Sequence, residues 1–127
     1  MPETTTRAAT TAITWFEIPT ADLDRAVRFY STILETPMSV ADFQGEPIAV
    51  FPYEQPGVGG CLVADAHPSP HGTLVFLNVD GRLDRTLELV EAAGGRIVAP
   101  KTSLGPIGYV AHIADSEGNR VGLHAVS

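Results

Sequence analysis

Hydrophobic and polar residues alternate at the start of the stretch 13–30 and then change period. Trp15 and Glu17 fall on one side of an extended chain, and the residues between them fall on the other. Pro19-Thr20 is expected to end this strand. An amphipathic helix with apolar residues at helical spacing is predicted to follow and to end near Leu34-Glu35. The stretch therefore predicts a strand that leads directly into a helix.

The rest of the chain repeats this order of elements. Three short extended segments separated by turn residues predict strands over 38–43, 47–51 and 59–64. Residues 65–72 contain two prolines and a terminal glycine, which is typical of a linker. Beyond it the pattern predicts a strand over 73–79, a helix over 82–93, and strands over 96–99, 108–114 and 119–126. Both halves thus read strand, helix and three strands.

Several identities support a true repeat at an offset of sixty positions. Phe16 corresponds to Phe76, and Leu23-Asp24-Arg25 corresponds to Leu83-Asp84-Arg85. Apolar positions of the last strand of each half also coincide when this offset is applied, with Cys61 on Val121 and Val63 on Leu123. The chain is therefore predicted to be an α+β protein built from duplicated βαβββ modules. The alternative is a ferredoxin-like α+β sandwich without duplication.

The repeat divides the chain into four parts. Residues 1–11 are expected to form a disordered or edge-strand arm, and residues 12–64 the first module. Residues 65–72 are the linker, and residues 73–127 the second module. The two modules are expected to form one domain together, since 127 residues suffice for one core.

Composition and charge argue against several functions. A formal net charge of −7 with only eight Lys and Arg argues against nucleic acid and anionic membrane surfaces as partners. No apolar run approaches the length of a membrane span. The N-terminus has no apolar segment typical of a secretory signal. Cys61 is the single cysteine, which precludes an intrachain disulfide and favours a cytoplasmic location.

Motifs in both halves resemble those of a known family. The first is D-L-x-R-A-x-x-F-Y over 22–30, which follows a strand. The second half adds L-N-V-D over 77–80, A-G-G over 93–95 and a closing D-x-x-G-N-R-V-G-L over 115–123. Together they resemble the vicinal oxygen chelate superfamily, which contains glyoxalase I, extradiol dioxygenases, fosfomycin-resistance enzymes and bleomycin-binding proteins. The resemblance covers the chain from Ile13 onward and implies curved mixed sheets that form a cup-shaped cavity. It specifies the fold more than the reaction.

The same resemblance places four metal-ligand positions in the cup. Aligned by the shared motifs, these positions are occupied by Trp15, Leu62, Leu74 and Gly122. None of these side chains offers a nitrogen, oxygen or sulfur donor suited to a divalent metal. We therefore expect no cofactor and no ordinary metal-dependent glyoxalase I chemistry. A relocated metal site on Glu17, His112 and His124 is the weaker alternative.

Strand alternation predicts which side chains share the cup. Glu17 faces the same way as Trp15, Phe76 the same way as Leu74, and His124 the same way as Gly122. The resemblance to the fosfomycin-resistance enzymes points His112 inward as well. Lys101 is a candidate to reach over the cup mouth towards an anionic substrate, with a solvated lysine as the alternative. An apolar cup with few polar groups is typical of a small-molecule site.

Two functions follow from these residues. In the first, the chain is a lyase or isomerase in which Glu17 and His112 act as the base and its orienting partner. In the second, it binds or sequesters a small apolar or aromatic molecule without chemistry. The family resemblance also implies a homodimer, and whether each cup forms within one chain or across two stays open. His67 and His71 are expected to be solvated in the linker.

Overall fold

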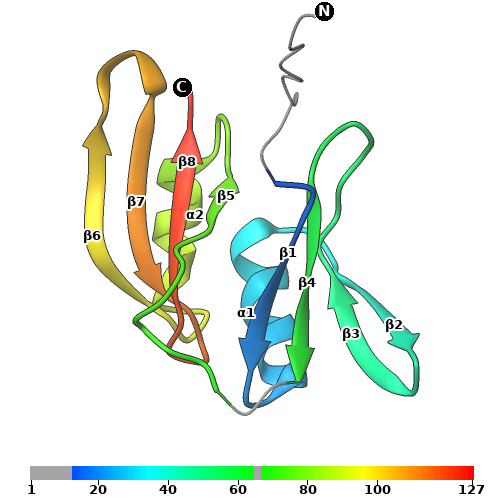
Figure 1. Ribbon diagram of the computed structural model, residues 1–127. Coiled ribbons are helices and arrows are strands. Elements are labelled where there is room, and N and C mark those ends of the chain that lie inside the picture. The colour runs from blue at the N-terminus through cyan, green and yellow to red at the C-terminus, as the bar shows by residue number, and fades with distance from the viewer. Residues whose placement is uncertain (1–12, 65–66) are drawn as a thin grey trace, which may run out of the picture.

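Two modules of the same architecture lie side by side in a computed structural model, which describes residues 13–64 and 67–127 (Figure 1). The N-terminal arm expected over 1–11 lies outside the described residues, as do positions 65 and 66 of the expected linker. Both halves show the predicted order of strand, helix and three strands, so the duplicated α+β architecture is confirmed.

The elements fall close to their predicted bounds. The first module contains β1 (Trp15–Thr20), α1 (Leu23–Leu34), β2 (Ser39–Phe43), β3 (Glu46–Val50) and β4 (Gly59–Ala64). The second contains β5 (Phe76–Asn78), α2 (Leu83–Val90), β6 (Arg96–Ser103), the short 3₁₀ helix η1 (Gly105–Ile107), β7 (Tyr109–Ala114) and β8 (Arg120–Ala125). The largest differences are a shorter β5, a shorter α2 and a longer β6 than the sequence predicts.

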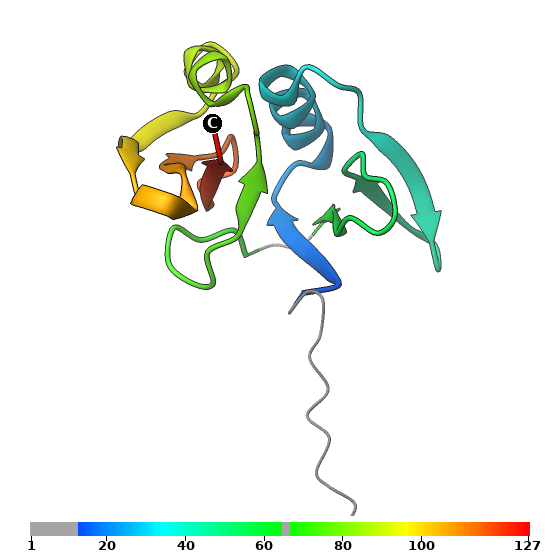
Figure 2. The same cartoon turned by 90° about the horizontal axis from the view of Figure 1, so that it is seen from above.

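Each module has its own mixed sheet of four strands. The strand orders are β1-β4-β3-β2 and β5-β8-β7-β6, with β1 parallel to β4, β5 parallel to β8 and all other pairs antiparallel. β1 and β5 are the inner edge strands, and the two helices lie next to each other on one side of the sheets (Figure 2). The two sheets remain separate and do not close into one barrel.

Helix α1 supplies much of the core of the first module. Its N-terminus is capped by Asp22, whose side chain accepts a hydrogen bond of 3.0 Å from the Arg25 backbone N–H. The face turned to the sheet buries Ala26, Phe29, Tyr30 and Ile33. These apolar side chains recur at helical spacing, so their burial against β3 and β4 fixes the orientation of the helix.

Strand β1 does not end where the sequence suggested. It continues through Pro19 and Thr20, which pair in register with Val63 and Ala64 of β4. Because β1 is an edge strand, only one of its sides needs backbone donors, and a proline there removes no required ladder bond. Pro19 is therefore compatible with the strand and does not end it.

The repeat is real, but its offset differs between helices and strands. Ile18 pairs with Leu62 in the first module, and Leu77 pairs with Leu123 in the second; all four are buried on the helix side. Ile18 and Leu77 are 59 positions apart, and Leu62 and Leu123 are 61 apart. The uniform offset of sixty holds for the helices, but it places the matched strand residues on opposite faces.

The turn between β7 and β8 binds the second module to the start of α1. The Glu117 carboxylate accepts hydrogen bonds from the backbone N–H groups of Ala21 and Asp22, at 3.0 and 2.9 Å, and its other oxygen lies 2.7 Å from Arg25 Nε. The Tyr30 hydroxyl donates a buried hydrogen bond of 2.7 Å to Asp115. These contacts join the second module to helix α1 of the first.

A second set of ion pairs joins the modules at the other end of α1. Glu35 ends the helix in a left-handed conformation, with φ of 53°, and its carboxylate pairs with Arg82 and Arg85 of the second module. The two guanidinium groups, Arg85 first, lower the pKa of Glu35 below its usual value. The relative placement of the two modules is thus fixed by charged contacts at both helix ends.

Candidate functional site

The face of each sheet turned away from its helix, here called the open face, carries most of the predicted site residues. On the first module, Trp15 and Glu17 project from β1 onto this face beside Cys61 of β4, the ladder partner of Glu17. The Trp15 ring is 40% exposed and meets Tyr53 edge-on, with ring centroids 5.8 Å apart. The predicted grouping of Trp15 with Glu17 agrees with this arrangement.

The position on β4 that faces the open side is Cys61, not Leu62. Leu62 pairs with Ile18 and is fully buried in the core on the helix side, so it cannot line a site on the open face. Burial raises the pKa of the Cys61 thiol, Trp15 lowers it, and the charge of Glu17 raises it further. The alignment of motifs placed this family position at Leu62, one residue away from Cys61. A shift of one residue moves the side chain to the opposite face of a strand.

On the second module, three predicted residues share the open face. Phe76 lies over Gly122, where an added Cβ would come within 2.3 Å of the Phe76 ring. The same ring meets the His112 imidazole edge-on, with centroids 5.6 Å apart. His112 Nδ1 is buried and has no hydrogen-bond partner. The hydrogen-bonding capacity of this nitrogen is therefore unused in the structure.

His124 and Lys101 are held by other contacts. His124 Nε2 is hydrogen-bonded at 2.8 Å to the carbonyl oxygen of Ile107, in the loop over the end of the sheet. Lys101 Nζ lies 3.1 Å from an Asp84 oxygen on α2 and 4.8 Å from the centre of the Tyr109 ring. Lys101 therefore points towards the helix of its module and does not reach over the open face as predicted.

Glu17 and His112 lie on different sheets of the chain, and no hydrogen bond or ion pair joins them. Within residues 13–64 and 67–127, no three His, Cys, Asp or Glu side chains are grouped so as to hold a metal ion. Glu17, His112 and His124 thus form no metal site within a single chain. At the four family positions, now Trp15, Cys61, Leu74 and Gly122, the one donor is a buried thiol with a raised pKa. This donor set does not fit a divalent metal.

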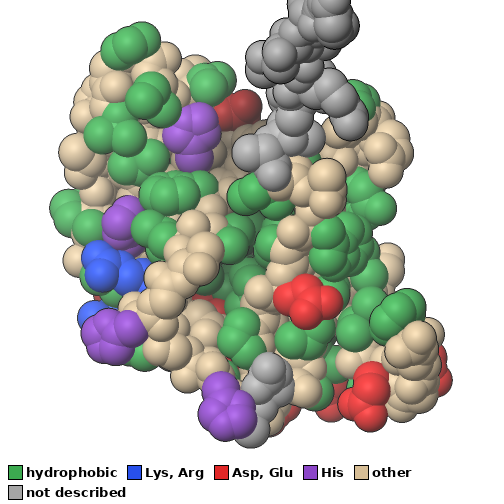
Figure 3. Space-filling model, viewed as in Figure 1, with side chains coloured by type: hydrophobic (Ala, Val, Ile, Leu, Met, Phe, Trp, Pro, Cys, Tyr) green, Lys and Arg blue, Asp and Glu red, His purple; other side chains and the backbone are tan. Residues whose placement is uncertain are grey.

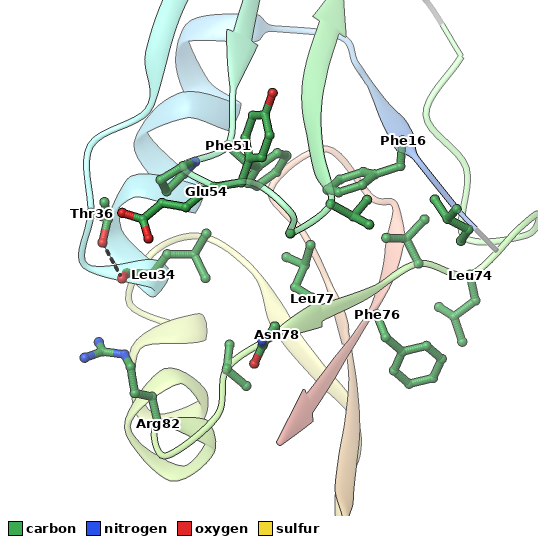
Figure 4. A pocket seen from close by; sticks show the side chains of 17 residues that line it. Phe16, Leu34, Thr36, Phe51, Glu54, Leu74, Phe76, Leu77, Asn78 and Arg82 are labelled. Carbon is green, nitrogen blue, oxygen red and sulfur yellow. Dashed lines mark hydrogen bonds between the residues drawn. The ribbon is translucent and has the colours of Figure 1, made fainter. Parts of the chain in front are cut away.

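A cavity lies between the two modules, along the facing edges of β1 and β5 (Figure 4). Its volume is about 830 Å³, within the range of sites that bind drug-sized molecules. We call it the seam cavity. It is lined by Ile13, Phe16, Leu34, Thr36, Phe51, Pro52, Tyr53, Glu54, Gly57, Val58, Leu74, Val75, Phe76, Leu77, Asn78, Val79 and Arg82.

Aromatic rings form much of the wall of the seam cavity, and polar side chains lie at its margin. Phe16 and Phe51 pack together with centroids 5.3 Å apart, and Phe76 of the second module also contributes to the lining (Figure 4). Glu54 and Arg82 bring one charge of each sign to the lining. Such a cavity favours a flat apolar molecule with few polar groups.

Two of the predicted ligand-binding residues, Leu74 and Phe76, line the seam cavity. Sequence reasoning missed Phe16 and Phe51, because alternation assigns Phe16 to the helix side and therefore to the core. Only the separation of the two sheets leaves room beside these rings. A signal existed in Gly60, the ladder partner of Phe16: an added Cβ there would lie 2.5 Å from the Phe16 ring.

Comparison with known proteins gives a family-level result. Residues 12–123 match the profile of the Glyoxalase/Bleomycin resistance protein/Dioxygenase superfamily. The chain belongs to this superfamily. The match spans both modules, and it confirms the resemblance to vicinal oxygen chelate proteins. No curated protein matches the chain significantly.

Solved structures share the fold at low sequence identity. A glyoxalase/bleomycin resistance protein from Albidiferax ferrireducens T118 is 15% identical, with a TM-score of 0.70 over 91% of this chain and 98% of that one. A fosfomycin resistance protein from Listeria monocytogenes is 14% identical, with a TM-score of 0.66 over 94% and 96%. A glyoxalase-related enzyme from Fulvimarina pelagi is 18% identical, with a TM-score of 0.64 over 89% and 86%. At these identities the likeness establishes the fold alone.

The described helices are too short or too polar to cross a bilayer.

Proposed function

We propose that this superfamily member binds a small, flat, apolar or aromatic molecule in the seam cavity. The observation that carries the proposal is a cavity of about 830 Å³ walled by Phe16, Phe51 and Phe76. Burial of an aromatic ligand against three rings removes apolar surface from water and adds ring contacts. The binding function is the better supported of the two, because the seam cavity holds no titratable pair arranged for proton transfer.

A blocking substitution tests this site. Val58 lines the cavity and is 36% exposed, so Val58→Trp adds bulk at the wall without opening the core. Val126→Trp is the matched control, since Val126 is exposed and lies outside the cavity lining. With 2-naphthol as the probe, we expect Val58→Trp to weaken binding at least about tenfold, whereas the control stays close to wild type. Equal affinity of both variants in a fluorescence titration would refute the site.

The enzyme hypothesis is retained as a second candidate because of His112. Its buried, unpartnered Nδ1 is a proton-transfer group without a structural use, and Glu17 is the carboxylate proposed to assist it. The two lie on separate sheets, so this mechanism requires a homodimer in which the open face of one module meets the other module of the partner chain. Exposed rings on these faces, Trp15, Phe43 and Phe76, favour such a dimer.

Mixed variants test the shared site. If one chain supplies Glu17 and the other His112, a lyase or isomerase activity should be lost in Glu17→Ala and in His112→Ala. Mixing the two variants should then restore part of it, since one intact site forms per heterodimer. Failure of the mixture to recover activity, with dimers verified by light scattering, would place the base elsewhere. A cytoplasmic location remains our proposal from the single free thiol of Cys61.

A further inference from the structure

We propose that the second module binds a small oxyanion, the phosphate or carboxylate group of a ligand, beside Arg120. The site is a cavity of about 360 Å³ between the segment 69–73 and the open face of the second sheet. It adjoins the seam cavity at Leu74, which lines both, and the proposed anion contacts come from residues outside the seam lining. Its polar lining includes Arg120, His112, His71 and Ser69.

The lining of this cavity contains no Asp or Glu side chain. That is unexpected in a chain with fifteen acidic residues and a net charge of −7. On the face shown in Figure 3, basic side chains gather over the second module next to histidines, whereas most visible acidic side chains lie over the first module. A negatively charged ligand would therefore meet a local field of the opposite sign to the whole protein.

Arg120 is the cation of this cavity, and it forms no ion pair with any residue that the structure describes. Four other cationic side chains of the described residues are already paired with carboxylates: Arg25, Arg82, Arg85 and Lys101. Arg28 and Arg96 are also unpaired, but neither lines this cavity. An unpaired guanidinium offers several N–H donors in a planar fork that suits phosphate or carboxylate oxygens.

His112 gives the second, independent reason. Its Nδ1 atom is buried, lies in a residue that lines this cavity, and has no hydrogen-bond partner. A buried polar atom without a partner is destabilising, and a turn of the imidazole towards the cavity would let a ligand oxygen accept a hydrogen bond from an N–H of the ring. An apolar ligand would leave the same atom unsatisfied. The unpartnered nitrogen and the unpaired guanidinium together favour an anion.

The carboxylate of Glu17 lies near the proposed anion site and restricts where the anion can bind. Glu17 lines an adjoining cavity of about 240 Å³, to which Arg120 and His71 also contribute. No ion pair between Glu17 and Arg120 is formed, so the guanidinium is not neutralised by it. The anion is accordingly expected on the side of Arg120 that faces His112.

A titration with inorganic phosphate tests the proposal. Ring resonances of His112 and His71 are followed by NMR while phosphate replaces chloride at constant ionic strength. We expect saturable shifts at His112, and binding at least about tenfold weaker in Arg120→Ala, because a charge-assisted hydrogen bond is lost. Arg120→Lys should retain part of the affinity. Arg28→Ala is the matched control, since it removes one unpaired arginine from the exposed face of helix α1.

The outcomes separate site-specific binding from general charge effects. Equal weakening in Arg120→Ala and Arg28→Ala would overturn the site, as would the absence of saturable shifts in the wild type. A parallel titration with acetate tells a carboxylate from a phosphate preference, and binding of either supports the site. Val58→Trp should leave phosphate binding intact, so a failure of the seam cavity would not be mistaken for a failure here.

Discussion

Glu117 shows how a single side chain holds the two modules together. Its carboxylate is fully buried against the first module and accepts hydrogen bonds from Arg25 and from two backbone N–H groups at the start of α1. The Arg25 hydrogen bond is the largest cause that lowers its pKa, from the usual 4.5 to about 2. The carboxylate also lies at the positive end of the helix dipole, where a negative charge is favoured.

The lowered pKa predicts an acid-dependent stability. Because the folded-state pKa lies below the unfolded value, the stabilisation is complete above about pH 4.5 and is lost as the pH falls towards 2. Glu117→Gln should therefore lower the free energy of unfolding by about 1–2 kcal/mol at pH 7, after allowance for solvent screening at the exposed Arg25. Urea denaturation of both proteins across this pH range measures the difference.

The control for this prediction is Glu88→Gln, since Glu88 is exposed and pairs only with Arg85 on the same helix. It should change stability by less than about 0.5 kcal/mol. A destabilisation by Glu117→Gln that stays constant down to pH 2 would show that the effect arises from packing and not from the charge.

Residue-level prediction from the sequence was correct where alternation alone decides orientation. It placed Trp15 and Glu17 on a common face of β1. It misplaced Leu62 and Lys101, for different physical reasons. Leu62 was aligned one residue out of register, and Lys101 has an alternative partner in Asp84 that only the packed helix α2 brings near. The spatial partners of a long flexible side chain are not encoded in its neighbours along the chain.

At the scale of elements, glycine positions decide where strands begin. Gly108 leads from η1 into β7 with φ of 113°, and an added Cβ would lie 2.4 Å from the carbonyl oxygen of Ala125. Gly45, in the hairpin between β2 and β3, has φ of 84° but nothing within 4 Å of the added atom. A comparison of substitutions at the two glycines therefore distinguishes the free-energy cost of a positive φ from that of a steric clash.

Alanine substitution should reveal both costs. Gly45→Ala is expected to lower the free energy of unfolding by about 1 kcal/mol, because a side chain disfavours a positive φ. Gly108→Ala should cost at least about 2 kcal/mol, since its Cβ also meets backbone atoms that cannot move aside easily. Thermal and urea unfolding of the two variants provide the comparison. Equal losses would mean that the loop before β7 shifts freely, contrary to its tight packing against β8.

The bounds of elements were predicted accurately where a regular hydrophobic pattern extends over many residues. They were predicted less accurately for short strands. Helix α1 and strand β4 were predicted with bounds within one residue. β5 is shorter than expected, with Phe76–Asn78 alone in the ladder with β8. β6 runs on to Ser103 past Pro100, and register shifts in its pairing with β7 accommodate the irregular stretch.

At the scale of the whole molecule, the two modules are joined by charged contacts at both ends of α1, and the seam cavity lies between their facing strands. A repeat in the sequence predicts two copies of a module, but it carries no information about how the copies meet. The position of the seam cavity was therefore inaccessible from sequence, although three residues of its wall were correctly predicted to lie on β1 or β5: Phe16, Phe76 and Leu77.

The separation of the sheets also explains why the predicted acid–base pair is incomplete in one chain. Glu17 belongs to the first sheet and His112 to the second, and the sheets do not pair along β1 and β5. Side chains on these open faces, such as Trp15 and Phe76, remain exposed unless another surface covers them. The separation of Glu17 from His112 therefore follows from the arrangement of the two sheets and not from either strand alone.

The most direct test of the seam cavity is methyl NMR of the wild-type protein during a titration with 2-naphthol. Binding in the seam cavity should produce ring-current shifts at Val58, Val75 and Val79, which line it, and little change at Ile48 and Val63 on the open face of the first sheet. Shifts confined to Ile48 and Val63 would contradict it, because the aromatic ligand would then occupy the open face and not the space between the modules.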